Sequence, residues 1–176
     1  MEERHGKGRQ EIDLSTEILE KYPNGGSVVV YNAVDRYTED FQRILSCAQF
    51  FAKQGKEVIL PPKVDVPYKN TAYDKIFSSL KGTSYYGKCP DMCVEEVWYE
   101  HEGYKTDNQK HALKNMLKHG LLQSDRIVIE DVCLTERYIL DRIKGKVHEG
   151  KLVSEVWIRK GRELVLVYVN TNDQSK

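Results

Sequence analysis

Hydrophobic residues follow two spacings along the chain, and the spacing separates expected helices from expected strands. Apolar residues recur every three or four positions from Tyr37 to Ala52, which predicts a helix. Thr38 or Asp35 can cap the start of this helix, and Gly55 lies where a terminating glycine belongs. Short runs of β-branched and other apolar residues predict strands at 27–31, 57–60 and 126–130. Further helices are expected near 71–80, 106–120 and 134–144, and extended segments at 92–94 and 97–104.

The two ends of the chain carry weaker patterns. Ile12, Ile18 and Leu19 form a rough helical stripe, so a helix is expected between residues 11 and 22, before a turn rich in proline and glycine. Near the other end, runs that alternate apolar and polar residues lie on both sides of Lys160 and Gly161. A two-residue turn that ends in glycine favours a C-terminal β-hairpin there.

The order of these elements predicts an α/β protein with a mixed β-sheet flanked by helices. The length of 176 residues suits one compact domain. We expect an N-terminal leader and helix at 1–26, a single α/β domain at 27–170 and a polar tail at 171–176.

Composition narrows the function classes. The chain has 27 basic and 27 acidic residues, and this zero net charge argues against strong non-specific binding of nucleic acid unless a local patch supplies it. It contains no apolar run of 18 residues, and its charged beginning lacks the apolar core of a secretory signal, so a cytoplasmic protein without membrane contact is expected. Four irregularly spaced cysteines argue against a disulfide scaffold.

The segment KCPDMCVEEVWYEHEGY, residues 88–104, carries the main candidates for chemistry. Alternation along a strand places Glu100 and Glu102 on one face, and antiparallel pairing with 92–94 brings Asp91 toward them. Three converging carboxylates suit a hard cation such as Mg²⁺, which can activate water beside a phosphate. The alternative is an ordinary acidic strand face exposed to solvent. A zinc site from Cys89, Cys93 and His101 lacks a fourth ligand at suitable local spacing.

These residues, with their flanking elements, resemble the PD-(D/E)XK nuclease superfamily, and within it the C-terminal tRNase domains of CdiA-type contact-dependent inhibition toxins. The resemblance runs from about Val28 to Val169. Three pieces carry it, namely DRYTEDFQRILSCAQFFAKQGKEVILPP, CPDMCVEEVWYEHE and ALKNMLKHGLLQSDRIVIED.

The resemblance implies a PD-(D/E)XK-like fold and a role for each acidic residue. Asp91 and Glu100 would be ligands of Mg²⁺ or Mn²⁺, joined by Glu39 from the first helix, with Asp40 as its rival. The lysine that the family carries two residues after the second acid is absent, because Glu102 stands there. Glu102 would then be a third ligand or a general base, or its presence would mark an inactive descendant.

Candidate contacts to nucleic acid lie elsewhere. Tyr85 and Tyr86, in a loop flanked by glycines, can stack on bases or pack in the core, and Gln123 can orient a phosphate or simply begin a strand. Lysines recur every four residues on the helix expected after residue 106, where they form either a phosphate-binding stripe or an ordinary solvated face: Lys110, Lys114 and Lys118.

The leading hypothesis is therefore a metal-dependent endonuclease. The toxin resemblance implies RNA, with tRNA as one candidate, in preference to DNA. It also implies an immunity-type protein partner and delivery into the cytoplasm as part of a toxin. The alternative is a catalytically inactive module of the same fold that binds nucleic acid or a protein partner.

Overall fold

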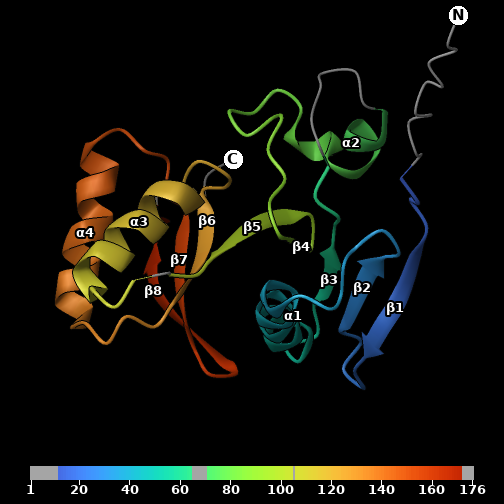
Figure 1. Cartoon of the computed structure of the whole chain (residues 1–176), viewed down its shortest axis with the longest axis horizontal. Helices are drawn as coiled ribbons and strands as arrows, with labels where there is room; N and C mark the ends of the chain where they lie inside the picture. Colours follow the sequence, from blue (N-terminus) through green and yellow to red (C-terminus); the bar gives the residue numbers. More distant parts are fainter. Residues whose placement is uncertain (1–11, 65–70, 105, 172–176) are drawn as a thin grey trace, which may run out of the picture.

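The structure is a computed structural model that describes residues 12–64, 71–104 and 106–171. The described residues form one eight-stranded sheet with four α-helices and a short 3₁₀ helix (Figure 1). The strands are β1 (Thr16–Lys21), β2 (Ser27–Tyr31), β3 (Glu57–Leu60), β4 (Met92–Val94), β5 (Val97–Glu102), β6 (Arg126–Glu130), β7 (Glu155–Lys160) and β8 (Glu163–Val169). The helices are α1 (Glu39–Ala52), α2 (Thr71–Ile76), η1 (Ser78–Leu80), α3 (Gln109–Gly120) and α4 (Glu136–His148).

The strands lie side by side in the order in which they occur in the chain. β2 and β3 are parallel, and so are β5, β6 and β7, while β1, β4 and β8 each run antiparallel to their neighbours. Consequently β2, β3 and β5 all point the same way, and their carboxyl ends open at the same edge of the sheet.

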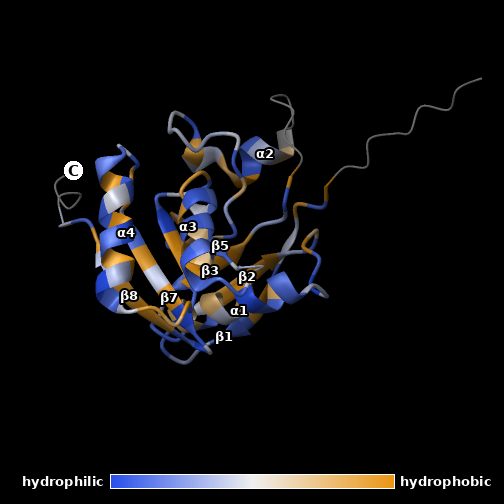
Figure 2. Ribbon diagram, turned by 60° about the vertical axis from the view of Figure 1, so that its left-hand side comes forward, coloured by the Kyte–Doolittle hydropathy of each residue, from blue (hydrophilic) through white to orange (hydrophobic). Residues whose placement is uncertain are grey.

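Helices cover both faces of the sheet. Successive residues of β6 face opposite sides of the sheet. Val128 packs in the hydrophobic cluster around α1, whereas Ile127 and Ile129 pack with α3 and α4. Figure 2 shows hydrophobic residues along the central strands and an alternation of hydrophobic and hydrophilic residues on α4. None of the described helices is long and apolar enough to cross a membrane.

The predicted mixed α/β class is confirmed at this coarse level, and so are the strands at 27–31, 57–60 and 126–130. Local capping also agrees at one helix, since the Thr38 hydroxyl accepts a hydrogen bond from the Phe41 amide at 3.1 Å. At α3 the cap is Asn108, whose side chain accepts a hydrogen bond from the His111 N–H at 3.1 Å.

The prediction of an N-terminal helix is wrong. Thr16–Lys21 is strand β1, which pairs antiparallel with β2 across the turn that contains Gly25 and Gly26. The rough helical stripe is too short to hold a helix alone. Pairing with the edge of β2 satisfies backbone groups that a marginal helix would leave to solvent.

Candidate functional site

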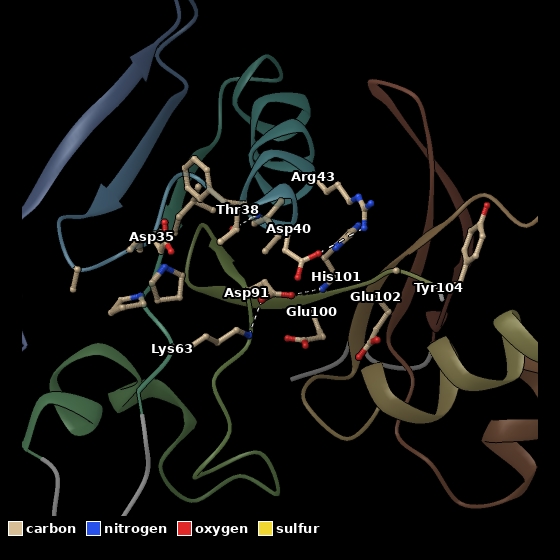
Figure 3. A pocket seen from close by; sticks show the side chains of 18 residues that line it. Asp35, Thr38, Asp40, Arg43, Lys63, Asp91, Glu100, His101, Glu102 and Tyr104 are labelled. Carbon is tan, nitrogen blue, oxygen red and sulfur yellow. Dashed lines mark hydrogen bonds and ion pairs between the residues drawn. The ribbon is translucent and has the colours of Figure 1, made fainter. Parts of the chain in front are cut away.

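A pocket of about 610 Å³ opens at the edge of the sheet where β2, β3 and β5 end (Figure 3). Three groups of residues line it. The segment after β2 and the start of α1 contribute one wall, the residues that follow β3 contribute another, and the end of β5 forms the floor. Crevices at the carboxyl ends of parallel strands are the usual binding sites of open α/β sheets.

The three carboxylates of the acidic segment, Asp91, Glu100 and Glu102, line this one pocket. Asp91 directly precedes β4, and its amide donates to the carbonyl of Tyr99 in the neighbouring strand at 3.1 Å. The tight turn between β4 and β5 has positive φ angles at both Glu95 and Glu96, which fits the primed turn type that a two-residue connection needs. The turn thereby sets the register that brings Asp91 beside β5.

Asp91 is held on both carboxylate oxygens. Its Oδ2 accepts the backbone N–H of His101 at 2.9 Å, and its Oδ1 lies 2.7 Å from the ammonium of Lys63. Only 6% of the Asp91 side chain is exposed, whereas 65% of the Lys63 side chain is. Although burial opposes it, the negative charges of Asp91 and Glu100 raise the pKa of Lys63, so the ammonium stays protonated.

Glu100 is the least compensated acid of the pocket. It is only 6% exposed, and its Oε2 is a buried atom without a hydrogen-bond partner among the described residues. Burial and the nearby charge of Asp91 raise the pKa of Glu100 well above its ordinary value, against the opposing effect of Lys63. A buried acceptor without a partner is costly, so this side chain favours an additional ligand.

Glu102 lies further along the same face of β5. A β-carbon at Gly120 of α3 would come within 3.1 Å of the Glu102 Cγ, so the glycine gives the stem of this side chain its space. Burial and the charge of Asp91 raise the pKa of Glu102 to about 7. A carboxylate with this pKa can accept and release a proton near neutral pH.

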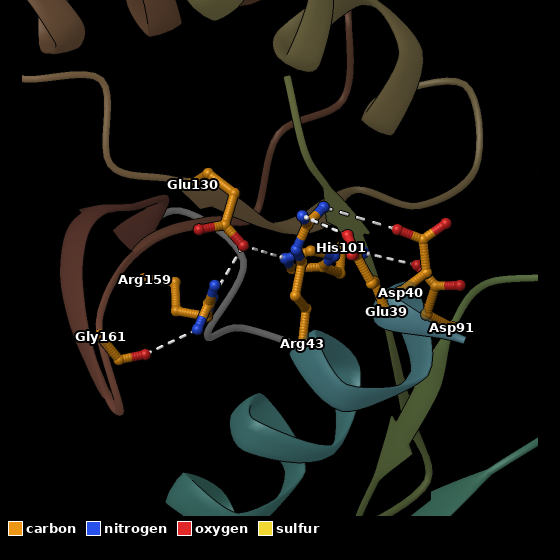
Figure 4. Close-up of polar contacts among 8 residues, drawn as sticks. All are labelled: Glu39, Asp40, Arg43, Asp91, His101, Glu130, Arg159 and Gly161. Atoms are coloured by element: carbon orange, nitrogen blue, oxygen red, sulfur yellow. Dashed lines mark hydrogen bonds and ion pairs between the residues drawn. The ribbon is translucent and has the colours of Figure 1, made fainter. Parts of the chain in front are cut away.

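A second ionic cluster lies on the opposite face of β5 (Figure 4). Nε2 of His101 donates to Oε1 of Glu130 at 2.8 Å, and Nε of Arg159 donates to the same oxygen at 2.7 Å. Although burial alone would raise it, these hydrogen bonds lower the pKa of Glu130. Through its backbone N–H, His101 links this cluster to Asp91.

Sequence reasoning missed two cationic residues of the pocket, Lys63 and Arg43. Lys63 follows the proline pair after β3, and its position at the end of a buried parallel strand was the one available indication. Arg43 of α1 lies 3.4 Å from Glu39 and 3.6 Å from Asp40, one turn or less away on the same helix. Guanidinium and ammonium groups in a pocket are suited to phosphate.

Several predicted site residues lie outside the pocket. Glu39 is not among its lining residues, and 91% of its side chain is exposed beside Arg43, whereas its rival Asp40 does line it. Tyr85 and Tyr86 are half-buried and pack in the cluster around α2, where the Tyr86 hydroxyl donates to Asp74 at 2.7 Å.

The remaining candidate contacts to nucleic acid are on and after α3. Gln123 lies in the turn after α3, three residues before β6 begins, and its backbone N–H donates to the carbonyl of Gly120 at 2.9 Å. The lysines of α3 all project into solvent: Lys110, Lys114 and Lys118. Lys110 also lies over the ring of Tyr138, 5.6 Å from its centre.

The carboxylates of the pocket are the kind of ligand that a hard cation prefers, although they are not arranged as a complete metal-binding site. Within the described residues, no three His, Cys, Asp or Glu side chains are placed to hold a metal ion together, and this applies equally to Cys89, Cys93 and His101. Burial and the charge of Asp91 nevertheless raise the pKa values of Glu100 and Glu102, and Oε2 of Glu100 has no hydrogen-bond partner among the described residues, so a positive charge placed there would be favourable. A divalent cation would supply that charge and find the oxygen ligands it prefers.

Comparisons with known proteins add no relative to this description. No protein-family model, curated protein or solved structure matches the chain. Its function therefore has to be inferred from the chemistry of the pocket itself.

Proposed function

We propose that the protein is a metal-dependent endonuclease that hydrolyses phosphodiester bonds. The observation that carries this proposal is the meeting of Asp91, Glu100 and Glu102 with Lys63 in one pocket at the carboxyl ends of parallel strands. Carboxylates that need a cation, beside an ammonium that suits a phosphate, are the groups that phosphodiester hydrolysis requires.

The order and direction of the central elements also support the proposal. α1, β3, β4, β5, α3 and β6 follow one another, with β3, β4 and β5 successively antiparallel and β6 parallel to β5. This order supports a PD-(D/E)XK-like core as part of the proposal. Glu100 lies on β5, and Asp91 directly precedes β4, which pairs with β5.

Five residues at the pocket have a role in this proposal. Asp91 and Glu100 would hold Mg²⁺ or Mn²⁺, which when bound supplies charge neutralisation and lowers the pKa of water. Glu102, with a pKa of about 7, accepts the proton of the attacking water. The ammonium of Lys63 stabilises the negative charge that develops on the phosphate oxygens. His101 fixes the orientation of Asp91 through its backbone N–H.

RNA is the proposed substrate, with tRNA as the first candidate and DNA as the alternative. Purified protein is incubated with end-labelled RNA and DNA in the presence of Mg²⁺ or Mn²⁺, and the rate of cleavage is measured. We expect Asp91→Asn and Glu100→Gln to lower that rate by about 10²–10⁴, the range of a lost catalytic group. Glu163→Gln, on the exposed start of β8, is the matched control and should cleave like wild type.

Circular dichroism and thermal unfolding accompany these assays, so that a loss of activity is separated from a loss of fold. Cleavage by neither wild type nor control, or equal cleavage by the Asp91 and Glu100 variants, contradicts the proposal.

Two observations favour the alternative of a binding module without catalysis. An ion pair with Lys63 already occupies Asp91, and glutamate stands at position 102 where the resemblance implies lysine. Such a module would bind RNA without turnover, and its affinity would fall with salt concentration as the lysines of α3 release counterions. Binding that withstands Lys110→Glu, Lys114→Glu and Lys118→Glu together would contradict this alternative.

A further inference from the structure

The oxygen atoms around Lys63 form a small cation site that the chain fills with its own side chain. Nζ of Lys63 lies 2.7 Å from Asp91 Oδ1 and 2.8 Å from the carbonyl oxygen of Cys89. Figure 3 shows the Glu100 carboxylate directed toward the same ammonium. One ammonium therefore lies among a carboxylate, a carbonyl and a further acid from separate parts of the chain.

This cation does not satisfy the site completely. Oε2 of Glu100 stays buried without a hydrogen-bond partner among the described residues, because the ammonium pairs with Asp91 instead. An ammonium offers three N–H groups in fixed directions, and the contacts to Asp91 and Cys89 account for two of them. A divalent ion carries twice the charge and is less directional, so it compensates two carboxylates better than lysine does.

Lys63 is also free to leave. Its side chain is 65% exposed and its stem is flexible, so the ammonium can move away from Asp91 into solvent. Asp91, in contrast, is buried and is fixed by the His101 amide. The acids therefore remain in place when the ammonium moves.

We infer that Lys63 is a built-in counter-cation of the Asp91–Glu100 site, which a divalent metal ion displaces when it binds. The inference rests on the proposed function for its choice of ligand, and it concerns metal binding only. The exchange shortens the contacts to the oxygens from the 2.7 Å of the ion pair to about 2.0–2.1 Å for Mg²⁺. The displaced ammonium stays on its stem at the pocket, where a phosphate can take the place of Asp91 as its partner.

Two measurements test the exchange without any nucleic acid. The first is a calorimetric titration with Mn²⁺ of wild type, Lys63→Met and Lys81→Met, where Lys81 is an exposed lysine after η1 and serves as the matched control. Methionine keeps most of the lysine stem and removes its charge. We expect Lys63→Met to bind Mn²⁺ about tenfold more tightly than wild type, within the 5–150-fold range of coupled binding, and Lys81→Met to match wild type.

The second measurement follows the ammonium directly in wild type. Amine acetylation is quantified by mass spectrometry at Lys63 and Lys81, with and without Mn²⁺. We expect Mn²⁺ to accelerate labelling of Lys63 severalfold and to leave Lys81 unchanged, because displacement frees the amine from Asp91.

Equal or weaker Mn²⁺ binding by Lys63→Met overturns the inference, and so does labelling of Lys63 that Mn²⁺ does not change. The outcomes also separate the inference from the proposed function. Exchange without cleavage of RNA or DNA contradicts only the nuclease proposal, whereas metal-dependent cleavage without exchange contradicts only the role of Lys63.

Discussion

The ionic clusters on the two faces of β5 differ in how far basic groups compensate their carboxylates. On one face, Glu130 receives hydrogen bonds from His101 and Arg159, and its pKa is lowered. On the other face, Lys63 pairs with Asp91, Oε2 of Glu100 has no hydrogen-bond partner among the described residues, and burial and the charge of Asp91 raise the pKa values of Glu100 and Glu102. The acid of the first cluster is fully paired, whereas the second cluster leaves a buried carboxylate oxygen unpaired.

This difference separates a structural cluster from a functional one. The lowered pKa of Glu130 adds stability that is present above the ordinary pKa of a glutamate and is lost as the pH falls through its folded value. The raised pKa of Glu102 acts in the opposite sense, because the folded state keeps a proton that the unfolded chain has released. Ionisable side chains whose pKa is shifted at the expense of the stability of the folded protein are characteristic of binding and catalytic sites.

The largest expected effect comes from breaking the complete cluster. Glu130→Gln leaves Arg159 without its counter-charge in a mostly buried position, and we expect a loss of about 3 kcal/mol in the free energy of unfolding. Urea denaturation at pH 7 measures it, with Glu163→Gln as the exposed control. A loss no greater than that of the control would show that the cluster does not hold the strands together.

In the pocket, the glutamate-to-glutamine substitution at Glu100 should raise the free energy of unfolding instead of lowering it. Glu100→Gln removes a buried carboxylate that is short of positive charge, so we expect the free energy of unfolding without metal to rise by about 2 kcal/mol at pH 7. Urea denaturation of both proteins in the presence of a chelator measures the change. Destabilisation by Glu100→Gln would mean that its carboxylate is already compensated, and the comparison across β5 would fail.

A smaller effect is expected at Glu102, and it depends on pH. Wild type should lose stability relative to Glu102→Gln as the pH rises from about 4.5 to about 7, since only the unfolded state is deprotonated in this interval. We expect the difference to reach about 1 kcal/mol at pH 8 after allowance for solvent screening of this half-buried group, and to vanish at pH 4. Thermal unfolding at both pH values without metal measures it. A difference independent of pH would assign the effect to packing.

The smallest effect is expected at Glu39. Its side chain is 91% exposed and its only described ionic partner is Arg43, so Glu39→Gln should change the free energy of unfolding by less than about 0.5 kcal/mol. RNA cleavage should also be unchanged, because the carboxylate lies outside the pocket. A loss of cleavage comparable to that of Asp91→Asn would return Glu39 to the ligand set.

Local patterns in the sequence predicted the central elements, whereas long-range pairing decided the rest. The periodicity of α1 and its Thr38 cap are local properties, and the alternation along β5 placed Glu100 and Glu102 on one face. The N-terminal segment was misassigned because pairing with β2 outweighs a weak helical stripe. Glu130 and Arg159 are 29 residues apart, and no local pattern brings them together.

In the candidate site too, local sequence patterns predicted some residues, whereas long-range strand pairing placed another. Asp91 directly precedes β4, and Glu100 and Glu102 lie on β5, which a tight turn joins to β4. Their proximity could therefore be predicted from the sequence. Lys63 lies 28 positions before Asp91 and reaches it only because β3 and β5 end at the same edge of the sheet. No local sequence pattern relates a lysine to an aspartate 28 positions away, so this contact could not be predicted from the sequence.

Thermal unfolding with and without Mn²⁺ shows whether the pocket around Glu100 is a cation site. Wild type and Glu100→Gln are compared in the same buffer at pH 7. We expect Mn²⁺ to raise the melting temperature of wild type, and we expect Glu100→Gln to melt higher than wild type without metal and not to respond to Mn²⁺. A wild type that ignores Mn²⁺, or a Glu100→Gln that responds equally, would contradict this expectation.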